Sequence, residues 1–576
     1  MSTRDSVLSK CVWLLVFGVV VGGWLQPAAG TALDDYIALP DPNFTYAFVN
    51  YFTGSGYAAY VLDMKSQVWR DEPNEVDREL WQHWVTIIKP TTVNGTRAFL
   101  FIDGGSNGGS PPSSVDSMLT TLATQTNTVV VDLRMVPNQR IKFTDETDPR
   151  YIANGRTEDE LIAYAWDKYL RTGDALWLPR LPMTNAAVLA MDATQAFIYG
   201  ATGGAVTIDD FVVSGASKRG WTTWTTAAVD PRVVAIVPIV IDVLNVEVSM
   251  THHYAAYGFW APAVHDYEDM GIMGWFQTPE IAAMFAVVDP YAYLARYTMP
   301  KFMINSAGDD FFLPDSSQFY FDDLPGEKYL RYVPNTDHSL DGSDAGDSLL
   351  AYYYAILAGM PRPQFSWTFV GDDAIHVQTV TPPPTEVRLW QATNTVARDF
   401  RKNPVGMPYS GPVWTDSVLT HQGGGLYIGQ VSMPPVGWRA FFVELTYTTI
   451  GPAPFKFTTE VRVVPDPATL NVDVVNPAWG RVVEIDPNFP RYYEPGTPVT
   501  LTAEANAGKG FKHWLIYDPN HPGDANYAAT DANASTTIAM DDDRDVTAVF
   551  KCGTGTGPML SLAAACCLGM IVRRRR

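Results

Sequence analysis

Short, continuous apolar runs recur along the first half of the chain, and stretches with helical periodicity lie between them. Each run reads as a strand buried on both faces of a sheet. The expected strands are residues 97–105, 128–133, 211–215, 233–242 and 301–310. The expected helices are residues 114–125, 158–171, 185–201 and 348–359. This alternation predicts a parallel sheet with helices on its faces, that is, an α/β protein.

Two β-rich segments, residues 58–68 and 81–89, precede this series and are separated by a polar turn. Two antiparallel strands followed by such a series are similar to the α/β-hydrolase arrangement, so we expect an α/β-hydrolase domain over residues 33–365. Residues 243–296, rich in aromatics and methionine, interrupt the alternation. We interpret them either as a cap over the site or as an extra packing layer.

The chain has 576 residues, more than one hydrophobic core supports, so further domains are expected. From residue 366 to 465 short β-like runs replace helical periods, which predicts a β-rich, sandwich-like domain. Residues 466–551 contain Tyr493 and Gly496 before VTLTA, then GKGFKHW and a closing VTAVF. This pattern resembles the InlB-type bacterial B-repeat, and the resemblance implies a small all-β surface module.

Both ends of the chain carry an apolar run beside basic residues. Residues 1–32 are typical of a secretory signal peptide cut near Gly30 or Ala32, with a short N-terminal anchor as the alternative. Residues 552–576 end in a largely apolar run of about 15 residues followed by four arginines. This run is shorter than the ~20 residues that a membrane-spanning helix needs. This tail looks like a bacterial sorting or anchor signal. We expect export to the cell envelope or cell surface, or secretion after tail processing.

Charge and cysteine content exclude several classes of function. The net charge is −22, and an acidic surface disfavours nucleic acid as a partner. The cysteines, Cys11, Cys552, Cys566 and Cys567, lie in or beside the terminal segments. The body of the chain therefore has no internal disulfide or Cys nucleophile. Without a phosphate loop, dinucleotide fingerprint or HExxH motif, no metal or organic cofactor is expected.

The stretch FVVSGASKRG, residues 211–220, runs from an expected strand into a helix through Ser217. A nucleophile exposed on such a turn needs small neighbours and a helix N-terminus behind it. Gly215, two residues before the serine, and Gly220, three after it, meet most of this pattern. Arg219 departs from it, because a small residue usually stands two places after the serine. Ser217 is the candidate nucleophile, with an ordinary loop serine as the alternative.

A serine nucleophile in this fold needs an acid and then a histidine, in that chain order. His338 follows the strand-like segment 328–334 and precedes the last long helix, so it is the candidate base. For the acid we favour Asp310, from its offset to the following proline, and expect Asp309 to be exposed or to cap a turn. Asp242, at the end of the preceding strand, is the alternative acid.

The glycine-rich loop DGGSNGG follows the strand at 97–105. Glycines there let backbone N–H groups approach a developing oxyanion, so Gly104 and Gly105 are the candidate donors. Lys218 and Arg219 either add charged donors or bind an anionic group of the substrate. Alternatively, both pair with acidic neighbours on the helix surface.

Several motifs together resemble the PhoPQ-activated pathogenicity-related protein family over about residues 35–465. They include EDELIAYAWDKYL, VVSGASKRGWTTW, GDDFFLPD and LWQATNTVARDFR. The resemblance implies an α/β-hydrolase fold and a link to bacterial virulence. GASKRG is also similar to the turn of glucuronoyl esterases, whose cation beside the serine assists the oxyanion.

These observations predict an exported serine hydrolase, esterase or peptidase-like, with a small-molecule, peptide or glycan ester as substrate. The tail would hold it at a membrane, and the β modules could bind a cell-surface partner. The alternatives are a carbohydrate esterase similar to glucuronoyl esterases, and a catalytically silent adhesion protein on a hydrolase scaffold.

Overall fold

The structure is a computed structural model that describes residues 30–70, 75–448, 451 and 453–553. The predicted signal peptide and sorting tail fall almost entirely outside these residues. Within the described part of the chain, no helix combines the length and the apolar character that a membrane crossing requires.

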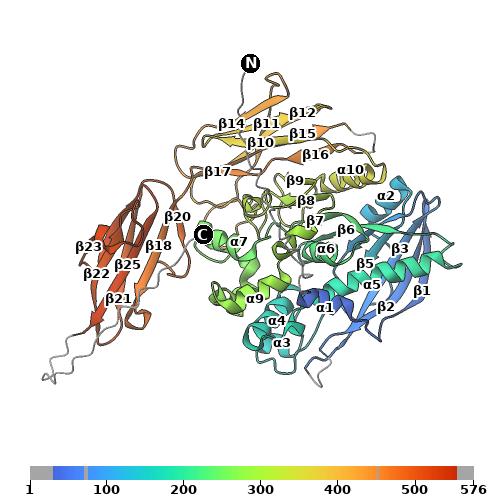
Figure 1. Cartoon of the computed structure of the whole chain (residues 1–576), viewed down its shortest axis with the longest axis horizontal. Coiled ribbons are helices and arrows are strands. Elements are labelled where there is room, and N and C mark those ends of the chain that lie inside the picture. The colour runs from blue at the N-terminus through green and yellow to red at the C-terminus, as the bar shows by residue number, and fades with distance from the viewer. Residues whose placement is uncertain (1–29, 71–74, 449–450, 452, 554–576) are drawn as a thin grey trace, which may run out of the picture.

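One large sheet organises most of the molecule (Figure 1). From the outer edge inward its strands are β1 (Thr45–Gly54), β2 (Tyr57–Val68), β3 (Leu80–Pro90), β5 (Val130–Leu133), β4 (Arg97–Ile102), β6 (Asp210–Ala216), β7 (Val233–Ile239), β8 (Lys301–Ser306) and β9 (Lys328–Val333). The neighbours from β1 to β5 pair antiparallel, and those from β5 to β9 pair parallel. The interchange of β4 and β5 is the crossover of a doubly wound sheet, so the predicted α/β-hydrolase fold is confirmed.

Helices cover both faces of this sheet, because successive residues of a buried strand point to opposite sides. Phe99 and Val212 belong to the core under α2 and α10, whereas the next residues, Leu100 and Val213, belong to the core under α5 and α6. The helices are α1 (Ala32–Ala38), α2 (Ser117–Thr126), α3 (Pro149–Ile152), α4 (Glu158–Thr172), α5 (Arg180–Tyr199), α6 (Lys218–Val229) and α10 (Ala345–Leu357).

The segment inserted after β7 contains α7 (Val246–Tyr257), α8 (His265–Asp269) and α9 (Pro279–Val288), with short 3₁₀ turns between and after them. It lies beside the carboxyl ends of the parallel strands, next to α4 (Figure 1). Its apolar side chains join the core that includes α5 and α6.

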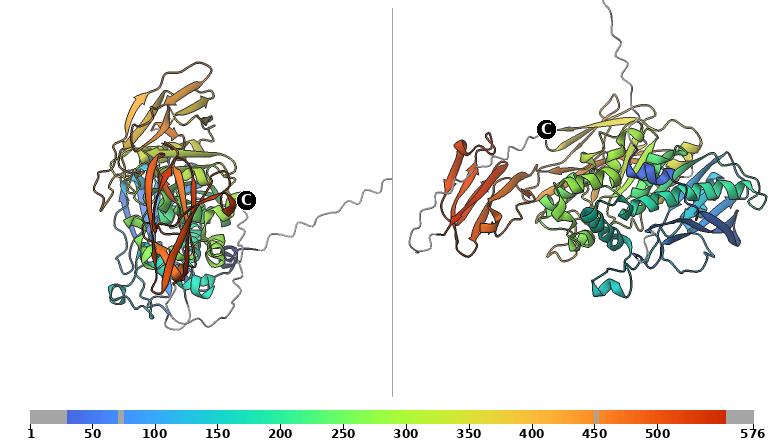
Figure 2. Two further views of the ribbon diagram at one scale, coloured as in Figure 1. Left: turned by 90° about the vertical axis from the view of Figure 1, so that its left-hand side faces the viewer. Right: turned by 60° about the horizontal axis from the view of Figure 1, so that its bottom comes forward.

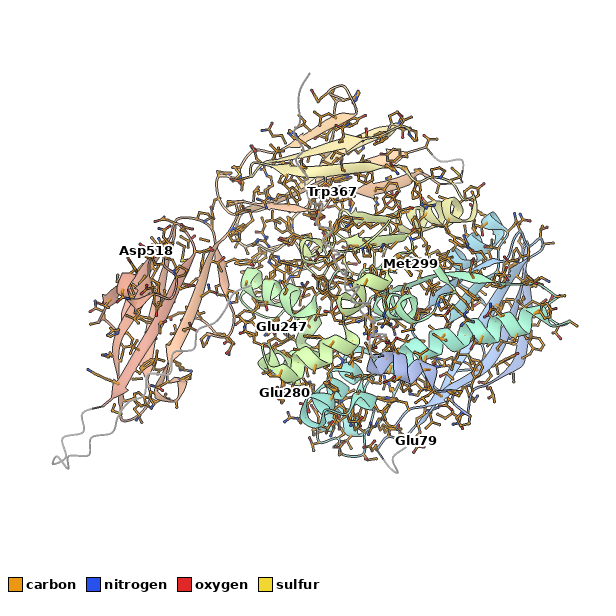
Figure 3. The ribbon with its side chains drawn as sticks, viewed as in Figure 1. Glu79, Glu247, Glu280, Met299, Trp367 and Asp518 are labelled. Atoms are coloured by element: carbon orange, nitrogen blue, oxygen red, sulfur yellow. The ribbon has the colours of Figure 1, made fainter. Side chains whose placement is uncertain are left out.

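The β-rich region forms two packed layers of strands, and one of these layers continues the main sheet. Three of its strands, β10 (Phe365–Val370), β11 (Ala374–Thr379) and β14 (Leu426–Gln430), form a small sheet. The others continue the main sheet past β9, in the order β16 (Phe455–Thr458), β15 (Trp438–Tyr447), β12 (Glu386–Asn394) and β13 (Thr415–Val418), with β17 (Arg462–Val464) also on β15. Trp367 lies at this junction (Figure 3), donating to Glu460 Oε2 at 3.2 Å.

A buried ion pair joins the hydrolase strands to these later strands. Arg331 on β9 binds Glu444 on β15, and their side chains are 2% and 3% exposed. Arg331 also donates to Asp344 Oδ1 at 2.8 Å. The backbone contact between β9 and β16 is short, with Thr458 opposite Leu330. The ion pair therefore reinforces a narrow junction between segments far apart in the sequence.

The last module packs on the segment after β7 and forms two small sheets at one end of the molecule (Figures 1 and 2). Their strands are β18 (Ala468–Val475), β19 (Gly480–Val482), β20 (Arg491–Tyr493), β21 (Thr497–Ala505), β22 (Lys509–Tyr517), β23 (Ala528–Asp531), β24 (Ser535–Met540) and β25 (Arg544–Cys552). Phe489 of this module lies among Tyr254, Trp260 and Phe276, with ring centroids 4.7, 5.1 and 6.0 Å away. Phe489 thus belongs to the main core rather than to the module's own core.

Replacing Glu444 by Leu leaves the Arg331 charge buried with Asp344 as its remaining carboxylate. We expect the free energy of unfolding to fall by about 3 kcal/mol, at the low end for a broken buried pair, in urea denaturation followed by tryptophan fluorescence. Glu504→Leu is the control, because its pair with Arg481 is exposed and such pairs contribute about 0.5 kcal/mol. Equal losses in both variants would contradict the role assigned to Glu444.

Candidate active site

Ser217 stands at the turn between β6 and α6, with φ +57° and ψ −127°. A residue with a side chain adopts this backbone at a cost of about 1–3 kcal/mol, and such strain concentrates at functional sites. The Ser217 N–H donates to Ile239 O on β7 at 2.8 Å, which fixes the turn to the neighbouring strand. This is the sharp strand-to-helix turn predicted from the sequence.

The glycines around Ser217 allow β6 and α6 to approach closely. A Cβ on Gly220 would lie 2.9 Å from Gly215 O, and a Cβ on Gly215 would lie 2.8 Å from Arg219 O. Gly220 therefore permits the close contact although it stands three residues after the serine. The Arg219 side chain points out of this contact, donating to Val136 O and to Glu158 Oε1, each at 2.5 Å.

His338 is paired with Asp309. Its Nδ1 lies 2.9 Å from both carboxylate oxygens of Asp309, whose side chain is 3% exposed. This contact favours a proton on Nδ1 and leaves Nε2 as the basic nitrogen. Nε2 has no hydrogen-bond partner among the described residues. Burial opposes the imidazolium form, but the Asp309 carboxylate outweighs it, so the pKa of His338 is raised.

The prediction that Asp310 pairs with His338 is therefore wrong, because it is the preceding carboxylate that turns inward. Phe311 N–H donates to Asp309 Oδ1 at 2.8 Å, which holds Asp309 in place. Burial and the nearby Asp309 carboxylate raise the pKa of Asp310 to about 6. Asp309 is buried rather than exposed, and it caps the turn as one of the expected alternatives while also binding His338.

Asp242, the alternative acid, binds elsewhere. Its carboxylate accepts hydrogen bonds from the hydroxyls of Tyr320 at 2.5 Å and Tyr332 at 2.6 Å. Burial raises the pKa of Asp242 to about 7, against the effect of these hydrogen bonds. It has no hydrogen bond or ion pair with His338.

The loops that carry Asp309 and His338 are held against each other at the ends of β8 and β9. A Cβ on Gly308 would lie 2.6 Å from Thr336 O, and Ser306 Oγ donates to that same carbonyl at 2.9 Å. From behind, Lys402 N–H donates to Gly308 O at 2.9 Å. The segment after β12 thus supports the acid loop, which the sequence did not indicate.

Lys218 and Arg219 are held by two acidic residues at the start of α4. Lys218 Nζ lies 3.0 Å from Glu158 Oε2 and 3.0 Å from Asp159 Oδ2. The Lys218 and Arg219 side chains are only 10% and 12% exposed. Burial opposes ionisation of Glu158, but the two cations outweigh it and lower its pKa to about 2. Lys218 and Arg219 thus pair with acidic neighbours, which was one of the two alternatives. The pairs lie in a buried cluster rather than on the helix surface.

The two candidate oxyanion glycines differ in this structure. Gly104 N–H donates to Asp103 Oδ1 at 2.7 Å, so this donor is occupied. Gly105, at φ +128°, makes no hydrogen bond through its N–H within the described residues. The Lys218 N–H is the first amide of α6 and has no partner within its own helix. Gly105 and Lys218 therefore have the N–H groups that remain without a partner among the described residues.

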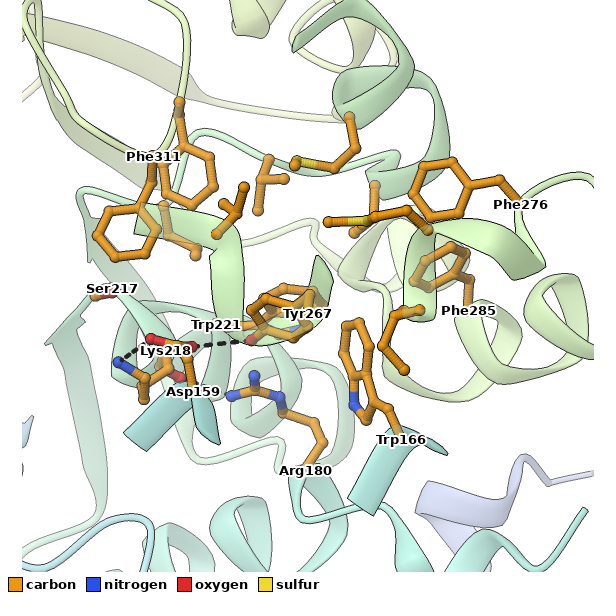
Figure 4. Close-up of a pocket in the computed structure, with 18 residues that line it drawn as sticks. Asp159, Trp166, Arg180, Ser217, Lys218, Trp221, Tyr267, Phe276, Phe285 and Phe311 are labelled. Carbon is orange, nitrogen blue, oxygen red and sulfur yellow. Dashed lines mark hydrogen bonds and ion pairs between the residues drawn. The ribbon is translucent and has the colours of Figure 1, made fainter. Parts of the chain in front are cut away.

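A small cavity of about 60 Å³ opens beside Ser217 (Figure 4). Phe311, whose ring centroid is 4.4 Å from that of His338, also lines it. Side chains from the segment after β7 form much of its apolar wall, namely Val246, Met250, Tyr267, Met273, Phe276 and Phe285. Residues 243–296 thus cover the pocket, as the cap alternative requires. The polar end is formed by Asp159, Arg180 and Lys218.

The profile of the family described as PhoPQ-activated pathogenicity-related protein matches residues 33–401. This chain belongs to the PhoPQ-activated pathogenicity-related protein family. The match ends before residue 465, where we had expected the resemblance to end. A second profile, the divergent InlB B-repeat domain, matches residues 470–554, which confirms the resemblance of the last module.

This member of the family has a curated relative in Dictyostelium discoideum, the autocrine proliferation repressor protein A. The two are 38% identical over 482 residues, which is 80% of this chain and 94% of that protein. Solved structures that are similar to this chain include acetyl xylan esterase 1 from Thermoanaerobacterium sp. JW/SL YS485, at 16% identity and a TM-score of 0.37, covering 56% of this chain and 93% of that one. Another is the acetyl xylan esterase from Paenibacillus sp. R4, at 11% identity and a TM-score of 0.40, covering 56% and 92%.

Replacing Asp309 by Asn should lower the pKa of His338 below the ordinary histidine value of ~6.5, because the opposing effect of burial remains. NMR titration of histidine side chains, with the His338 signal assigned from a His338→Gln protein, measures this shift. Asp310→Asn is the matched control and should move the His338 pKa much less. A larger fall in the control would restore Asp310 as the partner.

Proposed function

We propose that this protein is a serine hydrolase in which Ser217 is the nucleophile, His338 the general base and Asp309 the acid that orients the base. The observation that carries the proposal is the arrangement around one pocket. The strained turn at Ser217 lines this pocket, and so does Phe311. The ring of His338, which is paired with Asp309, packs against Phe311. The chain order Ser, Asp, His along β6, β8 and β9 is that of hydrolases with this sheet.

In the proposed mechanism Ser217 Oγ attacks the carbonyl carbon of an ester or amide while His338 Nε2 takes the hydroxyl proton. Asp309 keeps the other imidazole proton on Nδ1 and stabilises the imidazolium that forms. His338 then gives its proton to the leaving alcohol or amine, and an acyl-enzyme remains. A water molecule, activated by the same nitrogen, hydrolyses it and releases the acid.

Charge develops on the carbonyl oxygen in both steps, and the N–H groups of Lys218 and Gly105 are the donors proposed to stabilise it. The start of α6 adds the positive end of the helix dipole at the same place. The Lys218 ammonium group is held within the cluster of Glu158 and Asp159. We therefore assign it to fixing the first turn of α6 rather than to the oxyanion.

Location and partners belong to the same proposal. The terminal sequences favour export, with the tail either held at a membrane or removed. The proposed substrate is a small-molecule, peptide or glycan ester. The B-repeat-like module is consistent with a role at the cell surface.

A catalytically silent binding protein is the second candidate. It is favoured by one observation: within the described residues, Ser217 Oγ makes no hydrogen bond, to His338 or to any other group. Such contacts are often long in the absence of substrate and shorten when it binds.

A fluorophosphonate probe should label the wild-type protein and fail to label Ser217→Ala, because the probe reacts only with an activated serine. Labelling is read by gel fluorescence and located by mass spectrometry. Absence of labelling in a folded wild-type protein, or equal labelling of both proteins, favours the silent binding protein.

Asp309→Asn should slow labelling by about 10⁴-fold, the effect of an Asn in place of the acid of a Ser-His-Asp triad. Asp310→Asn, its matched control, should label at a rate close to that of the wild type. The wild-type rate should rise with pH through the raised pKa of His338, because the base must be neutral. A rate that is independent of pH across this range would exclude His338 as the base.

A further inference from the structure

Arg180, the first residue of α5, is a buried cation at the polar end of the pocket (Figure 4). The residue is 3% exposed, and no carboxylate of the described residues lies within ion-pair distance of it. Leaving a buried charge without a counterion costs several kcal/mol. The protein therefore maintains a guanidinium in a place where its own side chains do not neutralise it.

The guanidinium is only partly hydrogen-bonded. Its Nη1 donates to Lys218 O at 2.6 Å and to Thr222 Oγ1 at 3.1 Å, with the sulfur of Met183 at 4.0 Å. Its Nε is buried without a partner, and its Nη2 has no hydrogen bond within the described residues. Nε and Nη2 together form the edge with which arginine binds a carboxylate through two parallel hydrogen bonds.

The charges around Arg180 do not balance it. Glu158 and Asp159, at the start of α4, form ion pairs with Lys218 and Arg219, and neither forms one with Arg180. Asp159 contacts Lys218 and accepts from Tyr267 at 2.9 Å, so it reaches Arg180 only at longer range. Across the pocket, Asp309 is engaged by His338. The ring of Trp221 lies 4.6 Å from the guanidinium carbon of Arg180.

The pocket limits what else the ligand contains. Apart from its polar end, the wall is aromatic and aliphatic, so the part of the ligand between Ser217 and Arg180 is apolar. The cavity is small, about 60 Å³. Arg180 binds the carbonyl of the residue directly after Ser217, so this chain is short.

We propose that Arg180 forms a carboxylate-binding subsite, and that the substrate carries a carboxylate on a short apolar chain next to the bond cleaved by Ser217. The acyl group is then that of a short dicarboxylic acid, attached as a monoester or monoamide. The identity of the cleaved bond rests on the proposed function, whereas carboxylate binding at Arg180 does not.

Binding is tested first, in the full-chain Ser217→Ala protein, by ligand-observed NMR titration with butanoate and with its neutral isostere butanamide. We expect butanoate to bind at least about 10-fold more tightly, the preference of a charge-assisted bidentate contact. Arg180→Gln should bring the two dissociation constants close together, and Arg180→Lys should restore part of the preference. The control, Arg171→Gln, removes an exposed cation of α4 and should keep the full preference.

Turnover is tested next, with monomethyl succinate and its neutral counterpart methyl succinamate, by methanol release. The ratio of their kcat/KM values should favour the carboxylate in the wild type and fall toward one in Arg180→Gln. If Ser217 labels with fluorophosphonate but the protein shows no preference for butanoate or monomethyl succinate, the subsite is overturned and the hydrolase proposal stands. A preference for butanoate without labelling retains the subsite and overturns the hydrolase.

A purely structural Arg180 is also distinguishable. In that case Arg180→Gln lowers the melting temperature and weakens both ligands equally, with the wild type showing no preference between them. That result would overturn the proposal.

Discussion

The backbone at Ser217 depends on a close contact between the end of β6 and the first turn of α6. Gly215 O occupies the space where a side chain on residue 220 would lie, and Ile239 O holds the serine amide from the neighbouring strand. These contacts keep Ser217 in a conformation that it would not adopt alone. The position of the hydroxyl at the sheet edge and the opening of the pocket follow from this turn, as does the Lys218 amide, which has no partner among the described residues.

A buried cluster of charges surrounds that turn. Glu158 binds the two cations that follow the serine, so the start of α4 and the start of α6 are tied together under the cap. Buried ion pairs of this kind contribute little net stability, but losing one partner leaves a costly charge. The cluster therefore fixes the geometry of the first turn of α6, and it leaves Arg180 as the cation that a ligand can satisfy.

The succession of parallel strands along the chain could be predicted because each strand is buried on both faces and reads as an apolar run between helical periods. Ser217 and His338 could be located from that order. The acid could not be separated from its neighbour, because Asp309 and Asp310 differ only in which one turns inward. That choice is made by the loop itself, where Phe311 N–H binds Asp309.

The continuation of the sheet beyond β9 was also hidden from the sequence. Strands at 386–394 and 438–447 read as ordinary half-buried strands of a sandwich, and nothing local shows that a strand at 455–458 pairs with Leu330. Pairing between segments more than a hundred residues apart is decided by the whole core. The buried charges of Arg331 and Glu444 signal such a contact only once both positions are seen together.

Phe489 comes from the repeat-like module yet fills space among the aromatic rings of the cap, and Phe276, one of those rings, also lines the cavity beside Ser217. A chain shortened at residue 465 would lose this ring and leave a hollow behind the wall of the pocket. The module thus supports the cap by packing against it. A pull on the repeat from outside would reach the pocket where chemistry is proposed to occur through Phe489 and through the contact of Tyr492 with His252 on α7.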